Sequence, residues 1–115
     1  MSLLIYELNE VPRKLWDFYI ERNKNSALAE VTQKGTILNT VTKDKGELHP
    51  WSTWPTVYRG VYNDLHKIKF INQDLSIAKK YQPIWEILIK NNIDIGLFGS
   101  LQSYPPIKDK NIKFY

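Results

Sequence analysis

Residues 49–66 read HPWSTWPTVYRGVYNDLH, and the predicted fold is built outward from this stretch. Two tryptophans flank the pair Ser52-Thr53, and Pro55 follows at the expected start of a short helix that runs to Gly60. The first turn of a helix has backbone N–H groups without intrahelical partners and carries a partial positive charge. Ser52 and Thr53 are therefore expected where a phosphate or sulfate would bind, with a hydroxyl facing the anion.

The same residues also have a purely structural interpretation. Serine and threonine are common just before a helix, because the side-chain oxygen accepts a hydrogen bond from a backbone N–H group of the first turn. Taken alone, the local pattern favours this cap. A hydroxyl nucleophile also needs something to remove its proton, and the local pattern names no such group.

The stretch resembles the nucleophile segment of the alkaline phosphatase superfamily. The resemblance rests on Thr-Trp-Pro-Thr at 53–56, on Gly60, and on His66 six residues later. The resemblance is greatest for the nucleotide pyrophosphatase/phosphodiesterase branch, where Thr-aromatic-Pro opens a helix. Sulfatases carry Cys or Ser with Pro-Ser-Arg at the same place. This chain has fewer residues between the proline and the glycine, and Thr56-Val57 replaces the usual Asn-His. Because that Asn helps to hold the transferred group, only Thr56 is available for the contact here.

This resemblance implies metal-dependent hydrolysis of phosphate or sulfate esters, with two divalent metal ions and zinc as the expected metal. Thr53 would be the catalytic nucleophile and a metal ligand. Glu7 would be a second metal ligand, in place of the usual Asp at the end of the first strand. Ser52, Trp54 and Thr56 would contact the substrate. A covalent phosphothreonine would form and then be hydrolysed by metal-bound water.

Alternatives stay open for the other polar residues. Glu7 could instead cap its loop or pair with a nearby basic residue, and Asn9 and Glu10 are substitute metal ligands. His66 is interpreted as a support for the loop that follows the helix. His49 could touch the substrate or hydrogen-bond the loop backbone.

Hydrophobic patterning predicts an α/β fold with a mainly parallel sheet and helices on both faces. The expected strands lie at residues 3–7, 36–42, 67–71, 93–98 and 111–115. Further helices are expected to begin at Pro12, Ser26 and Pro83. Residues expected to be buried on the first two of these helices are Val11, Leu15, Phe18, Ala27, Leu28 and Val31.

Residues 1–115 are interpreted as the N-terminal part of one alkaline-phosphatase-like catalytic domain. The last predicted strand is interrupted by the end of the chain, so a longer protein is expected. The superfamily's other metal ligands are an Asp…His pair, an Asp-His dipeptide and a final His, and the resemblance places them beyond residue 115. The isolated polypeptide is therefore predicted to be inactive.

Composition restricts the remaining classes of function. The chain has no cysteine, which excludes disulfides and thiolate metal sites and suits a reducing cytoplasm. Its net charge of +4 comes from scattered lysines, typical of a solvated face, so no nucleic-acid partner is expected. No apolar run is long enough for a membrane span. The expected partner is a small phosphate or sulfate ester, and the two tryptophans suggest that its leaving group is flat or apolar.

A binding module is the competing hypothesis. A small basic α/β domain could use Trp51, Trp54 and the helix start to hold a phosphorylated ligand without cleaving it. Such a module would bind without metal and would lose affinity as salt is added. The hydrolase requires a divalent ion beside Glu7.

Overall fold

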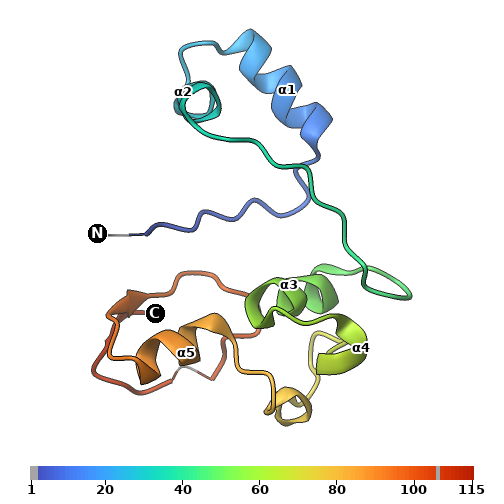
Figure 1. Cartoon of the computed structure of the whole chain (residues 1–115), viewed down its shortest axis with the longest axis vertical. Coiled ribbons are helices and arrows are strands. Elements are labelled where there is room, and N and C mark those ends of the chain that lie inside the picture. The colour runs from blue at the N-terminus through green and yellow to red at the C-terminus, as the bar shows by residue number, and fades with distance from the viewer. Residues whose placement is uncertain (1–2, 106) are drawn as a thin grey trace. The chain divides into compact units, whose positions relative to one another are not determined.

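The structure, a computed structural model, describes residues 3–105 and 107–115. The chain forms two compact units, Met1–Val41 and Thr42–Tyr115. Helices account for most of the regular structure (Figure 1). None of the helices in the described ranges has the length and apolar character that a membrane span requires.

Residues 3–41 of the N-terminal unit contain two helices, α1 (Arg13–Arg22) and α2 (Ala27–Lys34). Pro12 is the N-cap of α1, and Ser26 caps α2 by accepting a hydrogen bond from the Ala29 backbone N–H at 3.2 Å. Trp16 Nε1 donates to Thr32 Oγ1 at 2.9 Å and links the two helices. The predicted helix starts at Pro12 and Ser26 are confirmed.

Burial in the N-terminal unit differs from the prediction. In α1 no described residue is buried, and in α2 Ala29 is the buried residue. Phe18 and Val31, both expected in the core, are 52% and 62% exposed. Two helices of ten and eight residues offer each other too little surface to cover both apolar stripes, so this part of the prediction is wrong.

The two predicted strands of this region are also absent. Residues 3–7 and 36–42 all lie in the described part of the chain, and neither segment forms a strand. Leu4 and Val41 are 86% and 89% exposed. An apolar, β-branched sequence favours a strand only when a neighbouring strand accepts its hydrogen bonds, and no strand of the described residues pairs with either segment. The α/β class with a mainly parallel sheet stays a prediction.

In its described residues, 42–105 and 107–115, the C-terminal unit contains four short helices and a pair of strands (Figure 1). In chain order they are α3 (Pro50–Arg59), α4 (Asn63–His66), the 3-10 helix η1 (Leu75–Ala78), α5 (Ile84–Lys90), β1 (Ile95–Gly96) and β2 (Ile112–Phe114). The strands β1 and β2 are parallel, with Ile95 opposite Ile112. The expected helix after Pro83 is confirmed, and the strands expected at 93–98 and 111–115 are present in shorter form.

The prediction of a strand at residues 67–71 is wrong, because this segment forms no strand. One side chain, that of Gln73, takes up the backbone groups that a strand partner would bind. Its Oε1 accepts from the N–H groups of Lys69 and Phe70 at 2.8 and 3.2 Å, and its Nε2 donates to Lys67 O at 2.8 Å. A local side-chain to backbone network thus replaces the sheet ladder.

The core of the C-terminal unit lies between α3, α4, η1 and α5. Its buried apolar residues are Tyr58, Ile68, Ala78, Trp85 and Ile89. The Tyr58 and Trp85 rings meet edge to face with centroids 5.0 Å apart, which joins α3 to α5. Helix α3 ends at Gly60, whose positive φ of 64° is readily adopted by a residue without a side chain.

Candidate functional site

Helix α3 carries Thr53, but it begins earlier than predicted. Pro50 is its first residue and His49 its N-cap, so Pro55 lies inside the helix. The backbone N–H of Thr53 donates to His49 O at 2.9 Å. Thr53 is therefore within the helix, and the expectation that it lies among unpaired N–H groups before the helix start is wrong.

A side chain from a distant loop binds the carbonyl group that Pro55 leaves without its helical donor. In a regular helix the N–H of residue 55 would donate to Trp51 O, and proline has no N–H. Gln102 Nε2 donates to Trp51 O instead, at 2.7 Å. Gln102 was missed from the sequence because the two partners are 51 residues apart and no local pattern connects them.

The hydroxyls of Ser52 and Thr53 both donate to the same carbonyl oxygen, His49 O, at 3.0 Å. Ser52 Oγ also accepts from the His49 N–H at 3.2 Å, and Ser52 is only 2% exposed. Ser52 is thus buried in this structure, and its predicted contact with a substrate stays a prediction. Thr53 is partly exposed, so of the two neighbours it is the one that a ligand can reach. Burial therefore distinguishes the two neighbours.

Thr56 belongs to a partly buried chain of hydrogen bonds, here called the Asp44–Thr56–His66 network. Thr56 Oγ1 lies 2.6 Å from Asp44 Oδ2 and 3.0 Å from His66 Nε2. His66 Nδ1 accepts from the Ile68 N–H at 3.0 Å, so the proton of the neutral ring is assigned to Nε2. His66 then donates to Thr56, and Thr56 donates to Asp44.

The network joins three segments of the C-terminal unit. Asp44 Oδ1 accepts from the Asn63 N–H at 2.8 Å, and the Asn63 side chain makes two further bonds with the Lys45 backbone. His66 is fully buried, which confirms its interpretation as a support of the fold. The Thr56 hydroxyl uses its one proton within the network. Its predicted contact with the transferred group stays a prediction.

The environment of His66 makes protonation costly. Burial lowers the pKa of His66 below its usual 6.5, while the negative charges of Asp44 and Asp64 act against this shift. A second proton on Nδ1 would also break the hydrogen bond from the Ile68 N–H. The imidazole is therefore held neutral.

Lowering the pH should consequently destabilise the C-terminal unit. The unfolded chain takes up a proton near the usual His66 pKa of 6.5, whereas the folded chain resists it, so stability is full above this value and falls below it. Urea unfolding at about pH 7.5 and about pH 5.5 should show a smaller loss for His66→Gln than for the wild type. His49→Gln is the control for removal of an imidazole elsewhere. An equal loss in the wild type and His66→Gln would contradict this role.

The aromatic residues of α3 pack on their neighbours. The His49 ring stacks on Trp51 with centroids 4.5 Å apart, and His49 Nε2 lies 3.3 Å from Glu47 Oε2. Trp54 stacks on Tyr58 at 5.8 Å and is partly buried. The His49 side chain thus contacts Trp51 and Glu47, and its two interpretations, contact with the substrate or a hydrogen bond to the loop backbone, stay predictions. The predicted contact of Trp54 with substrate stays a prediction.

The predicted metal ligands lie in different units. Glu7 belongs to the N-terminal unit, where it is exposed, and Thr53 belongs to the C-terminal unit. Across residues 3–105 and 107–115, no three His, Asp or Glu side chains gather in a way that could hold a metal ion. One carboxylate and one hydroxyl are fewer than the four ligands of a zinc ion. The described residues do not fit a complete two-metal site, and a metal shared by Glu7 and Thr53 stays a prediction.

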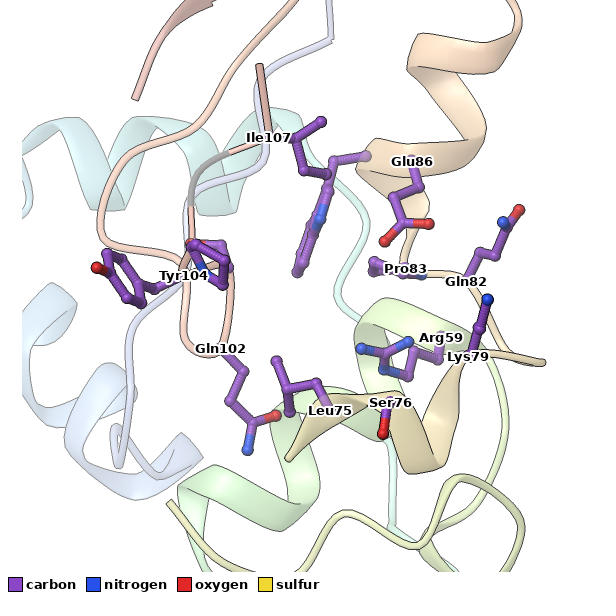
Figure 2. Close-up of a pocket in the computed structure, with 13 residues that line it drawn as sticks. Arg59, Leu75, Ser76, Lys79, Gln82, Pro83, Glu86, Gln102, Tyr104 and Ile107 are labelled. Carbon is purple, nitrogen blue, oxygen red and sulfur yellow. The ribbon is translucent and has the colours of Figure 1, made fainter. Parts of the chain in front are cut away.

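A pocket of about 350 Å³ opens elsewhere in the C-terminal unit (Figure 2). Figure 2 shows the Arg59 guanidinium and the Glu86 carboxylate directed toward the same space, from the end of α3 and from α5. Arg59 also donates to Tyr81 O, and burial lowers its pKa while Glu86 acts against this shift. The other described lining residues are Leu75, Ser76, Lys79, Gln82, Pro83, Trp85, Gln102, Ser103, Tyr104, Pro105 and Ile107. Thr53 is not among the described residues that line this pocket.

Comparison with known proteins identifies no relative. No protein-family model, no curated protein and no solved structure matches this chain. The alkaline-phosphatase-like interpretation therefore depends on the residues of segment 53–66 and on their order in the sequence.

Proposed function

We propose that this chain is part of a hydrolase of phosphate or sulfate esters in which Thr53 is the nucleophile. The observation that carries the proposal is the Thr-Trp-Pro-Thr segment at 53–56. Two features of α3 support it: Thr53 is partly exposed, whereas its hydroxyl neighbour Ser52 is buried. The described residues do not supply ligands for two metal ions, so we assign the activity to the full-length gene product.

A hydrogen bond to the backbone holds the Thr53 hydroxyl before the reaction. In the resting structure its hydroxyl donates to His49 O at 3.0 Å. For attack, the hydroxyl gives up this bond and its proton, and Oγ1 forms a bond to phosphorus or sulfur while the ester's alcohol oxygen leaves and takes up a proton. Water then cleaves the bond between Thr53 and the transferred group, which restores the hydroxyl. The restored Thr53 hydroxyl can then donate its hydrogen bond to His49 O again.

Rates on three aryl esters test this proposal. The full-length gene product should be incubated with an aryl phosphodiester, an aryl phosphomonoester and an aryl sulfate, each with and without a chelator. We expect hydrolysis of at least one ester, and loss of that activity with the chelator, because the resemblance implies divalent ions. Failure to hydrolyse any of the three in the presence of zinc, magnesium or manganese would contradict the proposal. The rank order of the rates identifies the substrate class.

The pocket around Arg59 favours a second candidate function, a module that binds a small anion without cleaving it. Arg59 and Lys79 line this pocket, and Arg59 is partly buried, where its charge is less screened than at the surface. Under this candidate, inorganic phosphate binds without metal, and added salt weakens the binding.

The test of this candidate is a phosphate titration followed by NMR. Arg59→Gln should weaken binding by about tenfold, the usual effect of losing one charged hydrogen bond. Lys90→Gln, an exposed change on α5, is the matched control and should bind as the wild type does. Equal phosphate affinity in wild type and Arg59→Gln would exclude the pocket as an anion site.

A further inference from the structure

We propose that Gln102 is a positioning residue for Thr53, because it completes the hydrogen bonding of the helical turn that carries this hydroxyl. This inference rests on the proposed function only for its catalytic consequence. Its structural part concerns the contact between the loop that follows β1 and the first turns of α3.

The need for Gln102 arises from Pro55. Within α3, Trp51 O is the carbonyl that residue 55 would satisfy, and proline both lacks the N–H and crowds the carbonyl four residues before it. Pro55 is buried, and the bond from Gln102 to Trp51 O is partly buried. Water therefore has restricted access to this carbonyl, and the Gln102 amide supplies the donor that Pro55 lacks.

The geometry of Gln102 fits this task. The side-chain amide must present Nε2 to Trp51 O, because the reverse orientation would place two oxygens against each other. Gln102 Oε1 is buried and has no hydrogen-bond partner among the described residues, so the contact with Trp51 alone determines the amide orientation.

The loop backbone is also shaped for this contact. Gln102 has a φ of 61°, an uncommon conformation for a residue with a side chain. Ser103 Oγ donates to Ser100 O at 2.7 Å and holds the adjacent turn of the loop. A loop that keeps Gln102 in this conformation presents its amide to α3 in a fixed position.

The contact lies two residues before Thr53. On the N-terminal side, the turn is held by His49 O, which accepts from the N–H groups of Ser52 and Thr53. On the C-terminal side, Pro55 has no N–H to donate to Trp51 O, so the hydrogen bond to this oxygen comes from the Gln102 amide. Loss of the Gln102 amide should therefore loosen the turn and displace the Thr53 hydroxyl. Small displacements of a reacting group can cost about 100-fold in rate.

A double-mutant cycle in the full-length gene product separates this role from general damage. Gln102→Met keeps the size of the side chain and removes the donor. It should lower kcat by about 10- to 100-fold with little change in KM, and it should accelerate amide hydrogen exchange at Ser52 and Thr53. Pro55→Ala restores a backbone N–H for Trp51 O. In that background, Gln102→Met should have a much smaller effect on both readouts.

Gln33→Met, an exposed change in α2, is the matched control and should leave kcat and exchange as in the wild type. Unchanged exchange and kcat in Gln102→Met, or equal losses with and without Pro55→Ala, would overturn the inference. If Gln102→Met lost activity only because it misfolds, adding Pro55→Ala would not restore that activity, since one added N–H in α3 cannot repair a misfolded chain. If the wild type hydrolyses no ester, the proposed function fails, and the exchange cycle still decides whether Gln102 holds the turn.

Discussion

Thr53→Ala in the full-length gene product is expected to lower turnover of the preferred ester by at least about 10³-fold, because removal of a nucleophile eliminates the covalent route. Thr53→Ser should retain part of the activity, since it keeps the hydroxyl. Steady-state rates on the preferred aryl ester measure both effects. The expected loss lies in kcat, because Thr53 forms and breaks the bond to the transferred group.

Two variants act as controls for Thr53→Ala. Val57→Ala changes a side chain on the same helix that is 65% exposed, and it should hydrolyse the ester at the wild-type rate. Ser52→Ala should lower stability, because Ser52 is buried and bonded to both backbone groups of His49, and it should cost far less in kcat. A Thr53→Ala protein with full activity, or a Ser52→Ala protein without any at full folding, would contradict the assignment.

Thr56→Val is expected to have the largest effect on stability. The variant keeps the shape of the side chain but removes the hydroxyl between Asp44 Oδ2 and His66 Nε2. It leaves a fully buried imidazole N–H without its acceptor, and the free energy of unfolding should fall by about 1–3 kcal/mol. Urea unfolding followed by tryptophan fluorescence reports on this unit, which contains Trp51, Trp54 and Trp85.

An exposed threonine provides the comparison for Thr56→Val. Thr40→Val should change the free energy of unfolding by no more than about 0.5 kcal/mol, as is usual for surface substitutions. If Thr56→Val keeps wild-type stability and loses only activity, then Thr56 contacts the substrate and its place in the network is unimportant. That result would favour the role implied by the superfamily resemblance.

Local sequence signals predicted the helix starts well. Pro12, Ser26 and Pro83 each lie at a position that suits the start of a helix for a reason contained in the residue itself, a fixed φ or a capping oxygen. Helix α3 was predicted to start five residues too late. Pro55 looked like a first-turn proline, and the donor that allows it inside the helix is Gln102, far along the chain.

The strands were predicted less well because a strand depends on its partners. Segment 67–71 has the alternation of a strand, yet Gln73 binds its backbone groups locally. Segment 3–7 has the composition of a buried strand, and segment 36–42 has a β-branched, partly alternating pattern. Neither signal identifies which other strand would pair with the segment.

The polar network could not be predicted from the sequence for a related reason. Asp44, Thr56 and His66 come from separate segments, and each spacing is compatible with many arrangements. The superfamily resemblance, and not the local pattern, implied a structural role for His66 and made Thr53 the nucleophile candidate of α3. Which hydroxyl of the Ser52-Thr53 pair is accessible became clear only from burial.

The most direct test of the central claim is a trapping measurement on the covalent intermediate. The full-length gene product should be mixed with the ester it hydrolyses fastest, quenched in acid during turnover, digested, and analysed by mass spectrometry. We expect the peptide containing residues 50–59 to carry the transferred phosphoryl or sulfuryl group. Fragmentation should place this group on Thr53, and the Thr53→Ala peptide should carry none. Turnover with no adduct on this peptide in repeated rapid quenches, or an adduct on Ser52 or Thr56, would contradict the account.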